Sequence, residues 1–382
     1  MYLKTPQNDG ALLDSIPSLI NKTFPIPGRF RNALPSDIAE LSGLLTNRRG
    51  DRSLSYLTRA NHLSAYLHYF LPWNLYRLCL LLPNLEINLS PGEAVADLGC
   101  GPMTFACALW IARPDLRNIP LEFYCIDRSS PVLEAGMKFF NALTVENADN
   151  KSSPWKIIPV KEDVDIKKKY TSGRAKRASL VCAVNIYNEF FDRISHNNTA
   201  GLRQIAANAA RFMLGRAEEN ASFLVIEPGV PQSGHFISLL RGEFIDLGYT
   251  PASPCTHASA CPCAAGQKRW CHFAFETTDA PKELMRLSTA AKLPKERLVM
   301  SFLHIENASR AENSGIRVIS DVFSLPGGRF GRYGCSADGL LLLTGDKYKI
   351  DDMTSFSLIN VNQKHTGSAV DQKSGAKILE LQ

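Results

Sequence analysis

Two glycines one residue apart, with carboxylates nearby, are the first residues whose types and spacing suggest chemistry. Gly99 and Gly101 follow an apolar segment that contains Asp97, and an apolar helix is expected directly after them. Glycine lets the backbone approach a ligand closely because it has no Cβ, and the start of the following helix offers free N–H groups to an acceptor such as a carboxylate. A second acid, Asp127, ends the next apolar segment, where it can bind both hydroxyls of a ribose. The pattern predicts a site for a nucleoside cofactor.

The residues around this turn favour S-adenosylmethionine over a dinucleotide. A dinucleotide fingerprint needs a third glycine, and the segment from Gly99 to Thr104 lacks it. Asp97 suits the cofactor's ammonium group, met directly or through water. The competing interpretation for Asp127 is an N-cap of the next helix. We predict six cofactor-binding residues, each in or after an expected strand: Asp97, Gly99, Gly101, Asp127 for the ribose, Asp163 for the adenine amino group, and Asn185.

Four cysteines within seventeen residues form a second group: Cys255, Cys261, Cys263 and Cys271. Thiolates at these spacings can converge on a soft metal or an iron–sulfur cluster. The spacings are not the two short Cys-x-x-Cys pairs of a structural zinc site. Because no secretory signal is evident, disulfides are disfavoured. The spacing leaves the fourth ligand open, and His257 and His272 are each either ligands or outer hydrogen-bond donors.

Alternating strands and helices must position these residues. Apolar strand patterns occur at 93–97, 121–126, 156–160, 179–184 and 222–227, and helical patterns at 103–112, 131–143, 199–214 and 234–247. Such alternation is typical of a parallel sheet covered by helices. Residues that follow successive strands are therefore expected to meet at one edge of the sheet.

The chain is expected to divide into five parts. We predict a helical N-terminal region (1–90), a Rossmann-like domain (91–250), a cysteine-rich segment with the last sheet strands (251–306), a small β-rich part (307–345) and a flexible tail (346–382). The tail is predicted to be flexible because its sequence is polar and poor in core residues.

Composition limits the partners. The 382 residues carry a net charge of +6, and a basic segment runs from Lys167 to Arg177, which permits a nucleic-acid partner without requiring one. The apolar stretch Leu75–Leu85 is too short for a bilayer and contains Arg77, so no membrane partner is expected. We expect a monomer.

Several motifs together resemble one known family. In order along the chain they are Asp97-Leu98-Gly99-Cys100-Gly101-Pro102, Asn185-Ile186-Tyr187-Asn188-Glu189-Phe190, Glu227-Pro228-Gly229, Pro254-Cys255-Thr256-His257 and Trp270-Cys271-His272-Phe273. This set, within roughly residues 50–345, resembles the methyltransferase-like protein 17 family of small-ribosomal-subunit factors, which has mitochondrial and bacterial members. The resemblance implies a class I methyltransferase fold, S-adenosylmethionine, a 4Fe–4S cluster and action on or binding to small-subunit rRNA.

The resemblance also implies a ligand set for the cluster: Cys255, Cys261, Cys271 and Cys335. Cys263 would then be a spectator, and Cys335, ahead of Asp338-Gly339, would join the β-rich part to the rest. The fold class that follows is an α/β, Rossmann-like class I methyltransferase with a helical N-terminal region, a cysteine-rich cluster insertion and a small β-rich C-terminal part.

No catalytic residue is identified. The Asn/Asp-Pro-Pro-aromatic motif of base-amino methyltransferases is absent after the fourth strand, where Asn185 to Asn188 stand instead. We therefore favour a cofactor-binding ribosome-assembly factor. Two alternatives remain: a catalytically active rRNA methyltransferase and a zinc-bearing small-molecule methyltransferase. A bacterial cytoplasm is favoured over a mitochondrial matrix.

Overall fold

The computed structural model describes residues 7–46, 57, 59–147, 153–168, 176–193, 198–307, 315–360 and 369–381. Its first part is helical: α1 (Gln7–Thr23), α2 (Gly28–Arg31), α3 (Leu34–Leu45), α4 (Ala60–Ala65), the π-helical turn η3 (Tyr66–Phe70), α5 (Leu71–Leu81) and the 3-10 turn η4 (Leu82–Asn84). α4, η3 and α5 follow one another without a break, and Pro72 stands in the first turn of α5, directly after the π-helical turn. No described helix has the length and apolarity to cross a membrane.

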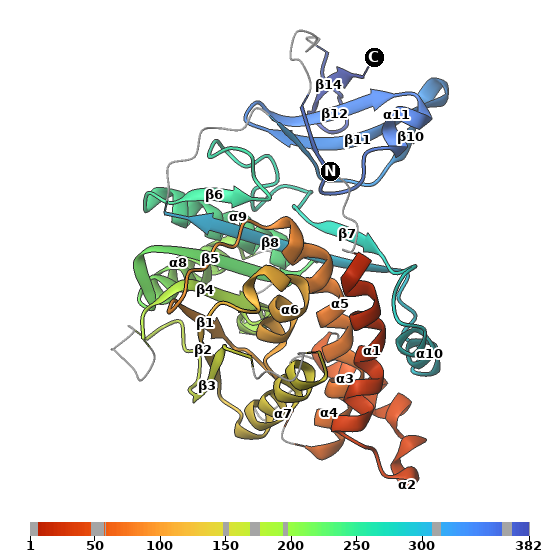
Figure 1. Ribbon diagram of the computed structural model, residues 1–382. Helices are drawn as coiled ribbons and strands as arrows, with labels where there is room; N and C mark the ends of the chain where they lie inside the picture. The colour runs from red at the N-terminus through yellow and green to blue at the C-terminus, as the bar shows by residue number, and fades with distance from the viewer. Residues whose placement is uncertain are drawn as a thin grey trace.

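An eight-stranded sheet forms the centre of the molecule (Figure 1). Its strands are β1 (Ala94–Leu98), β2 (Glu122–Asp127), β3 (Lys156–Lys161), β4 (Ala178–Val184), β5 (Ala217–Pro228), β6 (Thr250–Ser253), β7 (Phe273–Glu276) and β8 (Arg297–Glu306). They lie in the order β3-β2-β1-β4-β5-β8-β6, with β7 also paired to β8. β1 to β5 are parallel, and β8 is antiparallel to β5. This topology is an α/β Rossmann-like fold, as the sequence predicts.

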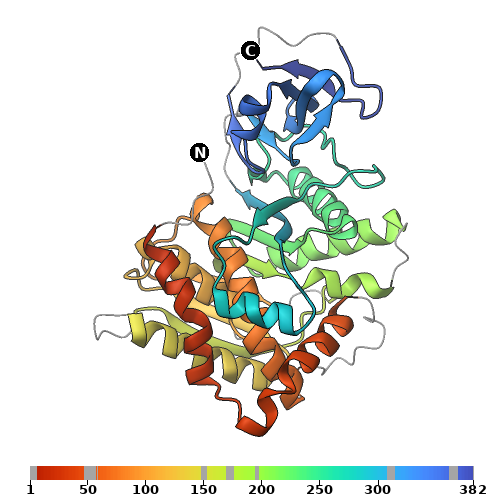
Figure 2. The same cartoon turned by 90° about the vertical axis from the view of Figure 1, so that its right-hand side faces the viewer.

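Helices cover both faces of this sheet. They are α6 (Thr104–Ala112), the turn η5 (Pro114–Leu116), α7 (Ser130–Asn147), the turn η6 (Tyr187–Arg193), α8 (Thr199–Leu214), α9 (Pro231–Asp246) and α10 (Lys282–Ala290). Alternate residues of the strands enter two cores: Val95 and Phe123 pack with α1, α5, α6 and α7, whereas Ala96 and Tyr124 pack with α8 and α9. Figure 2, turned by 90°, shows these helices on opposite sides of the sheet. Burial on both faces explains why the strands read as continuous apolar runs.

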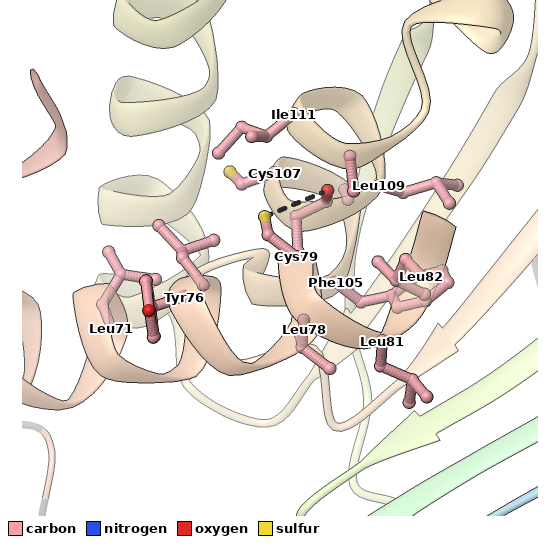
Figure 3. Close-up of a cluster of buried hydrophobic side chains, with 14 of the residues drawn as sticks. Leu71, Tyr76, Leu78, Cys79, Leu81, Leu82, Phe105, Cys107, Leu109 and Ile111 are labelled. Atoms are coloured by element: carbon pink, nitrogen blue, oxygen red, sulfur yellow. Dashed lines mark hydrogen bonds between the residues drawn. The ribbon is translucent and has the colours of Figure 1, made fainter. Parts of the chain in front are cut away.

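The N-terminal helices are part of the first core. Figure 3 shows α5 packed across α6, and Leu78, Leu82, Phe105 and Leu109 belong to the same buried cluster. The Cys79 thiol donates to the carbonyl oxygen of Ala108 over 3.7 Å. α5 is therefore anchored to the helix that follows the glycine turn.

A second, six-stranded sheet lies at the β6–β7–β8 side of the first (Figure 1). It comprises β9 (Ile316–Val318), β10 (Phe323–Leu325), β11 (Arg329–Ser336), β12 (Gly339–Gly345), β13 (Leu358–Ile359) and β14 (Lys377–Glu380), with the turn η7 (Pro326–Gly328) and helix α11 (Lys347–Asp351). Phe356 joins the two sheets because its ring packs against Phe273 and Phe302.

The segment 346–382, predicted to be a flexible tail, supplies elements to this second sheet. β13 pairs with β9, and β14 pairs in parallel with β12. Ile350 and Leu379 are buried in the core of the sheet. The polar sequence hid these elements because each is short and contributes only one or two core side chains. Residues 361–368 and 382 lie outside the described residues.

Candidate functional site

The predicted cofactor residues meet where the strand order reverses. β1 lies between β2 and β4, and the connections from these strands run to opposite sides. In open α/β sheets, ligands bind beyond the carboxyl ends of the strands at such a point. Asp97 lies in β1 beside Cys182 of β4, Asp127 ends β2, and Asn185 follows β4. The structure thus brings the acids and the amide to one edge.

The glycine turn is shaped by left-handed backbone conformations. Gly99 has φ +63° and Gly101 has φ +54°. A Cβ on Gly99 would lie 2.2 Å from Cδ1 of Ile186, so no side chain fits there without displacing Ile186. Met103, the N-cap residue directly before α6, is also left-handed, with φ 57°. The turn is therefore tightly fitted against the residue that follows Asn185.

Asp127 holds the glycine turn. Its Oδ2 accepts the N–H of Gly101 over 3.1 Å, and its Oδ1 accepts the N–H of Ser129 over 2.9 Å. Burial raises the pKa of Asp127, and these two N–H donors oppose that rise. The bond to Ser129 matches the helix-cap interpretation. The bond to Gly101 goes beyond it, because it ties the end of β2 to the turn after β1.

Asp97 is a fully buried carboxylate. Its Oδ1 accepts from the Cys182 thiol over 3.5 Å, and its Oδ2 has no hydrogen-bond partner among the described residues. Burial raises the pKa of Asp97 to about 8, with the nearby charge of Asp127 adding to the rise. A carboxylate oxygen without a partner at a ligand-binding edge is suited to accept from a cationic group.

The other two predicted residues differ in their surroundings. Asn185 has φ 56°, which is rare outside glycine, and its Oδ1 accepts from Nη2 of Arg77 over 3.0 Å. Asp163 lies two residues beyond β3, and its side chain is exposed. The backbone N–H of Glu162 donates to the carbonyl oxygen of Asp127 over 3.0 Å. Asp163 is therefore next to this edge but is not packed into it.

Four residues at this edge were not in the predicted set. Arg77 and Asn74 come from α5, and Tyr66 comes from η3; the pKa of Tyr66 is raised to about 12 by burial, with Asp127 and Glu189 adding to the rise. Glu227, at the end of β5, is fully buried and accepts the N–H groups of the two residues that begin η6, Tyr187 (2.8 Å) and Asn188 (3.2 Å). Burial raises the pKa of Glu227 to about 7. A lone arginine inside the apolar stretch Leu75–Leu85 was the available signal for Arg77.

The four cysteines of the second group and Cys335 gather between the two sheets. Cys255 follows β6, Cys261, Cys263 and Cys271 lie in the segment before β7, and Cys335 lies in β11. Burial raises the pKa of Cys261, Cys263, Cys271 and Cys335, and negative charge on neighbouring cysteines of the group raises each further. The thiols therefore lie within electrostatic range of one another, Cys263 included. In the part of the chain that the structure describes, no three Cys, His, Asp or Glu side chains are arranged to hold a metal ion.

Buried Arg241 and half-buried Arg317 lie beside these thiols. Nε of Arg241 donates to Cys255 Sγ over 3.2 Å, and its Nη2 donates to the carbonyl oxygens of His257 (2.7 Å) and Ser259 (2.9 Å). Burial lowers the pKa of Arg317 to about 10, and negative charge on Cys255, Cys271 and Cys335 opposes that shift. Arg317 also donates to the carbonyl oxygen of Pro254 over 2.9 Å. Arg241 from α9 and Arg317 from β9 thus place positive charge beside the thiols.

Of the two histidines considered as ligands, one lies beside the thiols and the other does not. Nε2 of His257 lies 3.4 Å from Cys335 Sγ, so this ring is beside the thiols, whereas the His272 ring stacks on Trp270. Residues 169–175 of the basic segment lie outside the described residues. The Trp270 indole donates to the carbonyl oxygen of Gly229 over 3.0 Å, which connects the cysteine segment to the exit of β5.

Comparison with known proteins identifies a family. The model of the family described as mitochondrial small ribosomal subunit Rsm22 matches residues 88–324, more than half of the chain. The match spans β1 to β9, ends inside β10 and so stops before Cys335. No curated protein matches this sequence.

Similar solved structures are methyltransferases. One is geranyl diphosphate methyltransferase in complex with GPP and sinefungin, with 12% identity, coverage of 72% of this chain and 100% of that chain, and a TM-score of 0.32. A second is the plantazolicin methyltransferase BpumL in complex with SAH, with 13% identity, coverage of 79% of this chain and 99% of that chain, and a TM-score of 0.29. A third is the 16S rRNA methyltransferase KamB, with 14% identity, coverage of 57% of this chain and 88% of that chain, and a TM-score of 0.30. The strand order, and not these low scores, identifies the fold.

Proposed function

The chain belongs to the Rsm22 family of the mitochondrial small ribosomal subunit, and we propose that it is an S-adenosylmethionine-binding, methyltransferase-like factor that binds small-subunit rRNA during ribosome assembly. The observation that carries this proposal is the coincidence of the family match with a cofactor edge built from β1, β2 and β4. The net charge of +6 suits an RNA partner.

The proposed cofactor residues have complementary roles. Asp97 would accept from the ammonium group with its unpartnered Oδ2, and a cation there would keep the carboxylate charged in spite of its burial. Asp127 would accept from the ribose hydroxyls, because each of its oxygens takes one backbone N–H and has capacity for a second donor. Asp163 would accept from the adenine amino group, and Gly99 and Gly101 let the backbone approach. When bound, S-adenosylmethionine supplies a methyl group on a sulfonium, ready for nucleophilic attack.

We propose Cys255, Cys261, Cys271 and Cys335 as ligands of a 4Fe–4S cluster. The donor set fits because soft thiolates are gathered with two arginines that offset their charge. Zinc is the alternative metal for these thiolates, and the metal content of the purified protein distinguishes the two. The cluster would join β11 to the cysteine segment of the first sheet.

Among the described residues, two candidates for activating a methyl acceptor are engaged in other contacts. The Cys182 thiol is buried, and it donates to Asp97 instead of facing an acceptor. Asn185, after β4, is engaged by Arg77. These contacts support an assembly factor over an active rRNA methyltransferase.

Binding to small ribosomal subunits tests the proposal. Full-length protein incubated with purified immature small subunits and radiolabelled S-adenosylmethionine should pellet with the particles and transfer no label to rRNA. Transfer of label would replace the assembly-factor proposal with the active methyltransferase. Failure to pellet at moderate salt, with zinc and no iron in the protein, would favour a small-molecule methyltransferase.

The compartment of the protein is inferred from the ribosome with which its family is associated. The family description is mitochondrial, so we propose the mitochondrial matrix as one setting. The bacterial cytoplasm that the sequence favours stays a prediction.

A further inference from the structure

Arg77 is a buried guanidinium at the cofactor edge with donor capacity to spare. Its side chain is 8% exposed. Nη2 donates to Asn74 Oδ1 over 3.1 Å and to Asn185 Oδ1 over 3.0 Å, while Nε is buried and has no hydrogen-bond partner among the described residues. Both contacts are to neutral amides, which satisfy hydrogen bonds but do not neutralise the charge.

Among the described residues, Glu227 is a carboxylate whose charge stabilises Arg77, and it is already engaged. The charge of Glu227 opposes the loss of the Arg77 proton, which burial favours by lowering its pKa to about 10. Both oxygens of Glu227 accept backbone N–H groups, from Tyr187 and Asn188. A buried cation with an unused N–H is costly unless an anion completes it.

The position of Arg77 indicates which anion that is. Its partner Asn185 follows β4, and β4 pairs with β1, where Asp97 opposes Cys182. Next to it along the same helices, the Tyr66 hydroxyl would lie 3.9 Å from a Cβ on Gly101. Arg77 and Asp97 therefore both belong to the switch point, and the glycine turn lies at the same edge. The amino-acid end of S-adenosylmethionine carries one cation and one anion, separated by a single carbon.

We propose that Arg77 binds the carboxylate of the cofactor's amino-acid end, with Asp97 taking the ammonium group. The N-terminal helices would then form part of the cofactor site instead of only covering the sheet. α5 suits this role because its packing on α6 fixes it against the helix that begins at the glycine turn (Figure 3). This inference rests on the proposed cofactor, which the experiment tests separately.

The test compares two ligands that differ only in the carboxylate: S-adenosylmethionine and decarboxylated S-adenosylmethionine. Isothermal titration of full-length wild type should show a preference for the first of roughly 10- to 100-fold, the range for charge-assisted hydrogen bonds to a buried group. Arg77→Met should remove this preference and leave the affinity for the decarboxylated ligand within about threefold. Arg211→Met, at an exposed arginine in the last turn of α8, is the matched control and should keep the preference.

Each result is decisive. Wild type that binds neither ligand would overturn the proposed cofactor and this inference together. Three results would overturn the inference but leave the proposed cofactor in place. They are wild type that binds both ligands equally, an Arg77→Met protein that keeps the preference, and an Arg77→Met protein that loses affinity for both ligands alike. If Arg77→Met does not fold, the ratio of the two affinities is measured in Arg77→Lys instead. An Arg77→Lys protein with the full wild-type preference would contradict the inference, because one ammonium cannot replace the guanidinium fork.

Discussion

The cofactor edge and the cysteine site are built in different ways. The edge takes Asp97, Asp127 and Asn185 from strand ends of one parallel sheet, where strand pairing alone fixes their neighbours. The cysteine site takes one thiol from β11 of the second sheet and the others from a segment between β6 and β7. The first site depends on the topology of one domain, and the second on the docking of two. A substitution at the edge should therefore alter the structure locally, whereas a substitution of a thiol should alter the docking of the whole second sheet.

The largest effect at the edge is expected from Gly99→Ala. The new Cβ would collide with Ile186, and alanine disfavours φ +63°. We expect the free energy of unfolding to fall by about 2–4 kcal/mol in urea denaturation, with cofactor binding lost. Gly92→Ala is the matched control, because Gly92 has φ +85° with nothing within 4 Å of a Cβ; it should lose only about 1–2 kcal/mol.

A double variant separates the two causes. Gly99→Ala with Ile186→Ala should unfold with a smaller loss than the sum of the two single changes, since the collision is gone. If the losses in the free energy of unfolding were fully additive, the Gly99 turn and Ile186 would not be in the close contact described.

A smaller effect of opposite sign is expected from Asp97→Asn. The pKa of Asp97 is about 8 in the folded protein and about 3.9 in an unfolded chain. Between these values the folded protein keeps a proton that the unfolded chain has released, so stability falls as pH rises from about 4 to about 8. Asparagine removes this dependence. The variant's free energy of unfolding should exceed that of wild type by roughly 1–3 kcal/mol at pH 8, with the gain shrinking toward pH 4.

The same variant should lose cofactor affinity, because an amide cannot neutralise the ammonium group. Urea denaturation of the ligand-free proteins across this pH range checks the first part. A stability gain that does not grow with pH would contradict the assignment of a buried, proton-holding carboxylate at position 97.

The smallest effect is expected from Asp163→Ala, since this side chain is exposed. Its stability should stay within about 0.5 kcal/mol of wild type, while affinity for S-adenosylmethionine should fall roughly 2- to 10-fold through the loss of one hydrogen bond. Titration calorimetry with adenosine-bearing and adenine-free fragments measures this. Unchanged affinity would show that the adenine amino group does not meet Asp163.

The comparison also explains what the sequence can predict. Each strand and helix of the Rossmann-like part is recognisable because its apolar run is bounded by turn residues, and Asp97, Asp127 and Asn185 follow from their places on those strands. Arg77 is not recognisable in this way, because its contact with Asn185 spans 108 positions and depends on how α5 packs. Cys335 enters only through the family resemblance. β13 and β14 are stabilised by their partners more than by their own sequences, so a polar tail concealed them.

Metal content tests the central claim about the second site most directly. Iron, sulfide and zinc are measured per chain in anaerobically purified wild type, in Cys335→Ser and in the control Cys79→Ser, whose thiol lies between α5 and α6. We predict about four irons with matching sulfide in wild type and control, and their loss in Cys335→Ser. Zinc that remains in Cys335→Ser, with no iron in wild type, would contradict the cluster and its role in joining the two sheets.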